Sequence, residues 1–204
     1  SKWALSHLTS ARPALPFSFT YGNARSTELL RSWQFVSSTR KLSAAKTERT
    51  LIWTDPKTKL SVRCVVVEYQ DFPAVEWTVY FKNTGANDTP ILEKIQGLDA
   101  SFERSAKDEF VLHGIKGDFC TTDSYEPYQL TLGPSLMKKF SPPDYSGKSC
   151  DGPEGWPYYN LKMPGGGIIL AVGWPGQWAS SFTRDADRSL RITAGQQRTY
   201  LLLK

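Results

Sequence analysis

The sequence is poor in imidazole side chains, with two histidines in 204 residues. His7 lies close to the first residue, and His113 lies in a segment with a strand pattern. A serine or cysteine nucleophile needs a nearby base, and the Gly-x-Ser-x-Gly turn that presents a catalytic serine does not occur in this sequence. We therefore interpret His113 as an ordinary strand residue, and the sequence argues against Ser–His or Cys–His catalysis.

Cysteine is also scarce, and the three cysteines fit neither a disulfide framework nor a zinc site with closely spaced ligands. Cys64 lies in a β-branched run, where a buried free thiol is expected. Cys120 and Cys150 lie in loop sequence rich in Gly and Pro, which leaves two alternatives open. They are either bridged by a disulfide or free, and a disulfide would favour a secreted or exported protein.

Long apolar runs and clusters of one charge are missing as well. No apolar run approaches the roughly 20 residues that a membrane-spanning helix needs. The formal net charge is +5, but the basic residues are scattered among acids except at Arg40-Lys41 and Lys138-Lys139. We expect a mixed, solvated surface, with neither a nucleic-acid nor a membrane partner. The glycines at 165–167 lack phosphate-loop spacing and no helix pattern follows them, so we predict no cofactor.

Alternation of apolar and polar residues with a period of two dominates the sequence. It is clearest at residues 75–82, where Val75, Trp77, Val79 and Phe81 form one face and Glu76, Thr78, Tyr80 and Lys82 the other, as in a half-buried strand. Only residues 26–33 have helical spacing. Strands are expected at residues 50–53, 60–69, 75–82, 91–102, 110–114, 158–161, 167–173, 178–184, 190–194 and 199–203. The sequence predicts an all-β antiparallel sandwich with at most one short helix, as a single domain over residues 1–204.

Residues 117–156 are rich in Gly, Pro, Asp, Ser and Tyr and are predicted to form a long irregular loop. The loop carries the carboxylates that a glycosidase could use as a pair. Each is expected to solvate the loop or to cap a turn, although one or two could bind a sugar, and Asp144 is our candidate for that role. These carboxylates are Asp118, Asp123, Glu126, Asp144, Asp151 and Glu154.

Aromatic residues are abundant, with seven Trp, nine Tyr and ten Phe, and several occur beside Gly and Pro. Sugars stack their C–H faces on such rings, while their hydroxyls bond to planar polar side chains. The alternative is that the rings fill the core of the sandwich. If they bind a carbohydrate, the candidate contacts are Trp156, Trp174, Gln177 and Trp178.

Three segments carry a family resemblance: WPYYNL at 156–161, GGGIILAVGWPGQW at 165–178 and ITAGQ at 192–196. They resemble glycoside hydrolase clan D, nearest to family 36, the α-galactosidases or melibiases. Residues 16–22 and 26–33 resemble the opening of the same amino-terminal module less specifically. Cys150 departs from the family's Gly-x-Ser-Ser loop element.

The resemblance implies a galactose-mutarotase-like β-supersandwich followed by a (β/α)8 barrel that cleaves α-galactosides with retention of configuration. The family's catalytic aspartates lie on barrel strands, and no barrel sequence occurs within residues 1–204, so no catalytic residue is assigned here. The implied partners are the chain's own carboxy-terminal barrel, a galactoside-type carbohydrate and a second copy of the chain. The start, without an initiating Met, is expected to result from either processing or an artificial boundary, and the apolar end at residues 200–204 is expected to be cut from something longer. Alternative hypotheses are a self-contained carbohydrate-binding module and a mutarotase-like epimerase.

Overall fold

A computed structural model describes residues 7–8, 15–104, 108–144 and 146–204. The chain divides into two compact units, each with its own hydrophobic core. Unit 1 comprises Ser1–Gly97 and Arg198–Lys204, and unit 2 comprises Leu98–Gln197. Among the described residues, strands account for 54% and helix for 3%, which confirms the predicted all-β fold with one short helix. No helix among the described residues is long and apolar enough to cross a membrane.

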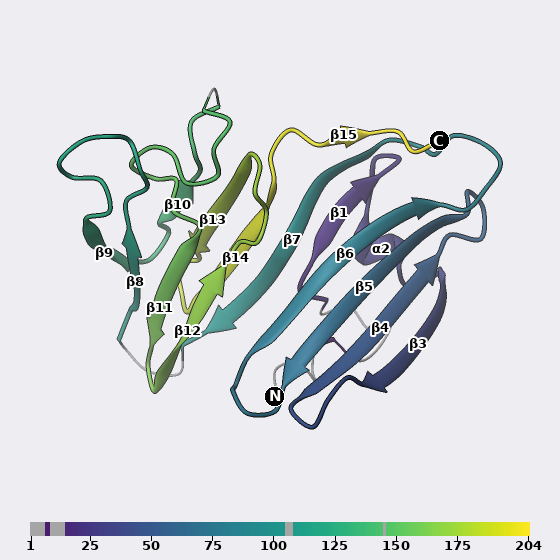
Figure 1. Ribbon diagram of the computed structural model, residues 1–204, viewed down its shortest axis with the longest axis horizontal. Coiled ribbons are helices and arrows are strands. Elements are labelled where there is room, and N and C mark those ends of the chain that lie inside the picture. Colours follow the sequence, from purple (N-terminus) through teal and green to yellow (C-terminus); the bar gives the residue numbers. More distant parts are fainter. Residues whose placement is uncertain (1–6, 9–14, 105–107, 145) are drawn as a thin grey trace. The chain divides into compact units, whose positions relative to one another are not determined.

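Unit 1 contains a four-stranded antiparallel sheet in simple chain order (Figure 1). Its strands are β3 (Gln34–Lys41), β4 (Lys46–Thr54), β5 (Leu60–Tyr69) and β6 (Val75–Asn83). In β6 the odd-numbered residues are half-buried and the even-numbered ones exposed, as the period of two predicted. In β5 the apolar run buries Cys64 completely. The alternation therefore fixes which face of this sheet meets the core.

The other side of the unit 1 core is formed by β1 (Ser18–Tyr21), β2 (Ala24–Arg25), α2 (Ser26–Leu29), the first half of β7 (Leu92–Glu103) and β15 (Tyr200–Leu201). The β1 side packs on the sheet through aromatic rings, with Phe17 at 5.9 Å from Trp53 and Phe19 at 5.1 Å from Phe81 between ring centroids. The predicted helix over 26–33 ends at Leu29. The amide and hydroxyl of Ser32 both donate to the Leu29 carbonyl at 3.0 Å, which turns the chain there.

Unit 2 is a second two-layer arrangement (Figure 1). One layer has the order β12-β11-β8-β9 and the other the order β10-β13-β14, next to β7. Tyr159 from the first layer meets Phe182 from the second at 5.2 Å, and the Tyr159 and Ser180 hydroxyls are 2.8 Å apart in the core. The strands are β8 (Phe110–Ile115), β9 (Pro127–Leu132), β10 (Met137–Phe140), β11 (Tyr158–Met163), β12 (Gly166–Ala171), β13 (Trp178–Arg184) and β14 (Ser189–Gln196).

The long strand β7 contributes to both cores. Leu92 and Ile95 belong to the core of unit 1, whereas Leu98 and Phe102 pack in the core of unit 2. The predicted strand over 91–102 therefore formed nearly as expected. One strand supplies apolar side chains to each unit in turn.

The prediction of one irregular loop over 117–156 is wrong for its middle, which forms β9 and β10. Both are edge strands that bury one face, through Leu132 in β9 and Phe140 in β10, and their short alternation is surrounded by residues typical of loops. The strand β3 was also missed. It is the edge of its sheet and carries Ser, Thr, Arg and Lys, which are typical of edges that avoid further pairing.

Candidate functional site

Three connections lie at one end of unit 2. Strand register puts the end of β8, the start of β11 and the end of β12 side by side, because Asn160 pairs with His113 and Tyr158 pairs with Ala171. The described residues that follow or precede these positions are 116–126, 141–144, 146–157 and 172–177, which we call the loop end of unit 2. It contains four of the five predicted sugar contacts: Asp144, Trp156, Trp174 and Gln177. The fifth, Trp178, is the first residue of β13 and directly follows the loop end.

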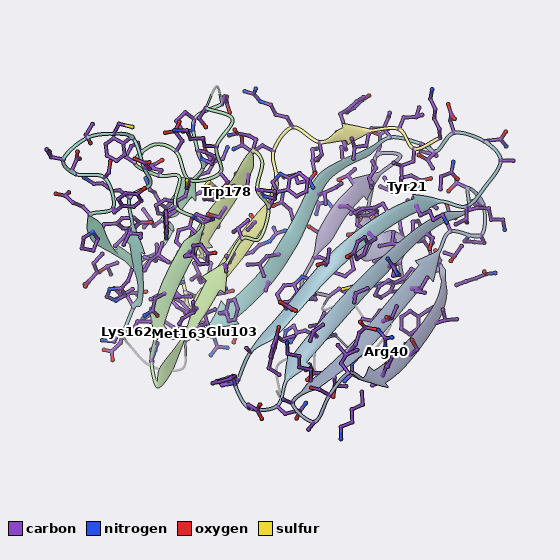
Figure 2. The ribbon with its side chains drawn as sticks, viewed as in Figure 1. Tyr21, Arg40, Glu103, Lys162, Met163 and Trp178 are labelled. Atoms are coloured by element: carbon purple, nitrogen blue, oxygen red, sulfur yellow. The ribbon has the colours of Figure 1, made fainter. Side chains whose placement is uncertain are left out.

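Trp178 anchors the loop end from inside the core. Its side chain is fully buried, and its indole N–H donates to the Ser149 carbonyl at 2.7 Å. Figure 2 shows Trp178 at the loop end of β13, with Lys162 and Met163 at the far end of unit 2 beside the β11–β12 turn. A fully buried ring has no face open to a ligand. In this structure the indole of Trp178 holds the loop segment at Ser149 in place, and its role as a sugar contact stays a prediction.

Gln177 also connects loops. Its side-chain amide donates to the Pro142 carbonyl at 2.9 Å and approaches the Gln197 side-chain oxygen at 3.4 Å. Its amide N–H groups are therefore engaged within the protein. This bond ties the segment 172–177 to the segment 141–144, so that the two exposed candidates, Trp174 and Asp144, lie on hydrogen-bonded loops.

Trp174 is the most exposed of the predicted aromatic contacts, with 43% of its surface open. Its ring lies over the backbone of Gly176, where an added Cβ would come within 2.8 Å of the indole Nε1. The glycine therefore permits the ring to fold over the turn. An exposed indole whose position is fixed by packing is suited to contact a sugar or another protein surface.

Trp156 belongs to a ladder of three rings. It contacts Tyr125 at 5.7 Å and Tyr158 at 5.9 Å between ring centroids. Tyr125 and Tyr158 are about half exposed. Sequence reasoning missed both tyrosines as site residues. The i, i+2 spacing of Trp156 and Tyr158 was a usable signal, whereas Tyr125 comes from another loop and reaches the ladder only in the folded chain.

The outer face of the sheet β12-β11-β8-β9 continues from Tyr158. Asn160 lies two residues after Tyr158 on β11. It pairs with His113 on β8, and His113 pairs with Gln129 on β9. Asn160 and Gln129 are exposed and His113 is half-buried. This row of planar polar side chains places amides, not carboxylates, directly opposite His113, which gives an epimerase mechanism based on a His–carboxylate pair no support.

Most acidic residues of the loop end stabilise the loops through ion pairs or hydrogen bonds. Lys116 Nζ pairs with Asp123 at 2.8 Å and with Glu126 at 2.9 Å, and Lys138 pairs with Glu154. The hydrogen bond from Lys116, followed by that from Thr121, lowers the pKa of Asp123 to about 2. A carboxylate with so low a pKa is a poor general acid.

Asp118 and Asp151 accept backbone hydrogen bonds in tight turns. As predicted, these carboxylates serve loop structure. The described residues contain no cluster of His, Cys, Asp and Glu that could hold a metal ion.

The three cysteines are free thiols in the structure. Cys64 is buried in unit 1, where burial raises the pKa of its thiol to about 12. That position agrees with the predicted buried thiol. Cys120 is exposed and Cys150 is half-buried, and both lie in the loop end of unit 2.

The fold and the loop end define an all-β module in which three of the loop carboxylates are paired with lysines. No family model matches the sequence, and no curated protein sequence matches it. Solved structures do match. The galactosidase domain of the α-galactosidase–sucrose kinase AgaSK superposes with a TM-score of 0.67 at 14% identity, covering 93% of this chain and 27% of that one.

Two further solved structures agree. The family 36 α-galactosidase AgaA from Geobacillus stearothermophilus, in complex with 1-deoxygalactonojirimycin, gives a TM-score of 0.65 at 15% identity, covering 94% of this chain and 28% of that one. The α-galactosidase from Lactobacillus brevis gives 0.66 at 14% identity, covering 92% and 28%. The chain thus has the fold of a part of family 36 α-galactosidases and spans less than a third of their length.

Proposed function

We propose that this chain is the non-catalytic amino-terminal module of a retaining α-galactosidase-type glycoside hydrolase. The observation that carries the proposal is the match of almost the whole chain to about 28% of three α-galactosidases. In this proposal the catalytic carboxylates belong to a barrel outside residues 1–204. The module shapes the entrance of the active site and packs on the barrel or on a neighbouring subunit.

The loop end of unit 2 supports this role. Its carboxylates Asp123, Glu126 and Glu154 are engaged by lysines. Trp174 and Asp144 are exposed on loops that the Gln177–Pro142 hydrogen bond joins. Exposed groups on a braced loop can contact a substrate or a protein surface with little loss of conformational entropy. We assign the contact with the barrel entrance, or with a galactoside, to these two side chains.

The first experiment compares two proteins: residues 1–204 alone and the full-length product of the gene. With a p-nitrophenyl α-galactoside as substrate, we expect turnover by the full-length enzyme and none by residues 1–204. A coding sequence that continues past Lys204 into alternating strands and helices would agree. A stop codon directly after Lys204, or full activity of residues 1–204, would contradict the proposal.

The second experiment tests the loop end in the full-length enzyme with Trp174→Ala. If Trp174 contributes to the entrance, KM for raffinose should rise several-fold while the melting temperature stays nearly unchanged. The matched control is Met137→Ala, an apolar side chain at the start of β10 that is more exposed than Trp174, at 68% against 43%. Equal kinetics in the two variants would remove Trp174 from the entrance.

A second candidate function is a self-contained carbohydrate-binding module. The ring ladder Tyr125–Trp156–Tyr158, next to the polar row Asn160–His113 on an open sheet face, favours it. Calorimetric titration of residues 1–204 with galactose and raffinose tests it. Binding that Tyr158→Ala abolishes and Val36→Ala, an exposed position on β3, preserves would support this candidate. No heat of binding at millimolar sugar would exclude it.

A further inference from the structure

The two segments that carry Cys120 and Cys150 are joined by main-chain hydrogen bonds. The Asp118 N–H donates to the Cys150 carbonyl at 2.7 Å, and the Gly152 N–H donates to the Asp118 carbonyl at 3.2 Å. These two bonds form a parallel bridge between Asp118 and Asp151, outside any strand. The chain immediately before Cys120 is therefore fixed against the chain at Cys150.

The approach of the two segments is unusually close at Gly117. A Cβ built there would lie 2.3 Å from the Cys150 carbonyl oxygen and 2.6 Å from that of Gly152. Both contacts are with backbone, which cannot move aside as a flexible side chain can. Glycine at position 117 is therefore what lets the two cysteine segments lie in contact.

A tight turn follows the bridge and keeps Cys120 near it. The Cys120 N–H donates to the Asp118 side chain at 3.2 Å, and Cys120 itself has a φ of 59°, in the left-handed region. Aspartate side chains commonly reverse the chain in this way. A disulfide requires Cα atoms about 4.4–6.8 Å apart. Cys120 follows Asp118 by two residues and Cys150 directly precedes Asp151, so it is the turn at Cys120 that directs its side chain back toward Cys150.

Tyr125 follows Cys120 in the same loop and contacts Trp156, from the segment that follows Cys150. The pKa of its hydroxyl is raised first by burial, then by Asp118 and by the charges that Cys150 and Cys120 would carry as thiolates. Cys120 is exposed and Cys150 is half-buried, so an oxidant in solution can reach this pair. Cys64 is fully buried in unit 1, so it does not compete with Cys120 and Cys150 for the oxidant.

We propose that Cys120 and Cys150 form a disulfide under oxidising conditions, locking the two segments of the loop end together. With glutathione disulfide as oxidant, the Cys120 thiolate attacks one glutathione sulfur and expels a glutathione thiolate. The Cys150 thiolate then attacks the Cys120 sulfur and expels the second one. The protein loses two electrons and two protons, and glutathione disulfide becomes two reduced glutathiones. This inference does not depend on the enzyme to which the module belongs.

The bond closes the segment from residue 120 to residue 150, which contains β9, β10 and Asp144. Closing a loop of this length stabilises a protein mainly by restricting the unfolded chain. We expect the oxidised protein to melt on the order of 5–10 °C above the reduced one. The exposed Asp144 loop would also lose freedom, because its end at Cys150 becomes covalently fixed.

The experiment equilibrates the protein in a glutathione redox buffer, blocks remaining thiols and maps the peptides by mass spectrometry. The expected result is a cross-linked peptide pair containing Cys120 and Cys150, two hydrogen atoms lighter than its reduced parts, with Cys64 alkylated only after unfolding. Cys120→Ser and Cys150→Ser should each abolish the redox-dependent shift in melting temperature, whereas Cys64→Ala should retain it.

Three outcomes would overturn the proposal. The first is that the blocking reagent still modifies both Cys120 and Cys150 after oxidation. The second is that both carry stable glutathione adducts. The third is that the cross-links join two chains or involve Cys64. The peptide map of the unmodified sequence decides among these outcomes even if a serine variant fails to fold.

Discussion

The indole N–H of Trp178 donates to the carbonyl oxygen of Ser149 at 2.7 Å, which joins the first residue of β13 to the loop before β11. The ring itself is fully buried in the core of unit 2. A single side chain therefore couples the packing of the sandwich to the shape of its loop end.

Replacing Trp178 should destabilise the protein, more when the whole ring is removed than when only the indole N–H donor is lost. Trp178→Ala is expected to lower the free energy of unfolding by about 3–5 kcal/mol, because it empties a large buried site. Trp178→Phe retains a ring but loses the donor to Ser149, so about 1–3 kcal/mol is expected. Urea denaturation measures both. Trp174→Phe, at an exposed ring, should stay within about 0.5 kcal/mol, and an equal loss there would contradict this account.

Arg184 organises the β13–β14 turn from a buried position. Its side chain is fully buried, pairs with Glu109 at 3.3 Å and with Asp185, and donates to the Ser189 carbonyl at 3.3 Å. Lysine cannot reproduce this planar set of donors. Arg184→Lys should cost on the order of 3 kcal/mol in the free energy of unfolding.

The control for Arg184 is Arg191→Lys. Arg191 makes a two-pronged pair with Asp99 at 2.8 Å, but 59% of its side chain is exposed. Exposed pairs contribute about 0–1 kcal/mol, so this variant should unfold nearly like the parent protein. Two equal losses would show that burial does not distinguish the two arginines.

Asp123 should make stability depend on acid pH. The hydrogen bond from Lys116 lowers its pKa in the folded protein from 3.8 to about 2. A depressed pKa contributes stability that is complete above about pH 4 and is lost as pH falls from about 4 to about 2. Asp123→Asn should therefore lower the melting temperature at pH 6 and flatten its decline below pH 4.

Melting temperatures between pH 2 and pH 6 check this dependence. Asp88→Asn removes an exposed carboxylate in unit 1 and serves as the control. It should decline with acid as the parent protein does. An Asp123→Asn protein with the parent's acid profile would show that the pair with Lys116 does not contribute.

The cysteines of the fully reduced protein should differ in reactivity. Burial raises the pKa of Cys64 to about 12, so at pH 8 almost none of it is thiolate. With a chromogenic disulfide reagent we expect Cys120 to react first, Cys150 more slowly, and Cys64 only after denaturation. Rapid modification of Cys64 in the folded protein would contradict its burial.

Periodicity predicted most of the strands that bury one face, including the edge strand β6. Strands β5, β6, β13 and β14 have clear inward and outward faces, because each is covered on one side. The edge strand β3 was missed because nearly all its side chains are exposed, so little hydrophobic pattern is imposed on it. Strands β9 and β10 do bury one face, through Leu132 and Phe140, but they are short and lie within sequence rich in Gly, Pro and Ser that favours a loop. The helix at 26–33 was overextended because Ser32 captures the Leu29 carbonyl.

The site was predicted only in part. Composition identified aromatic residues next to Gly and Pro, but it could not distinguish Trp178, buried in the core, from Trp174, exposed on the neighbouring turn. The two differ by four positions in one motif. Tyr125 entered the ring ladder only through the tertiary fold, because a loop 31 residues before Trp156 in the sequence brings it there.

The sequence by itself determined the all-β class, the central strands and the resemblance to family 36 α-galactosidases, because alternation and motif are local properties of the chain. The tertiary structure decided which rings are open, which carboxylates are engaged by lysines, and that Cys120 and Cys150 flank one backbone bridge. These depend on contacts between residues far apart in sequence. Hydrogen bonds between loops, such as those of Gln177 and Asp118, produce no periodic pattern in the sequence.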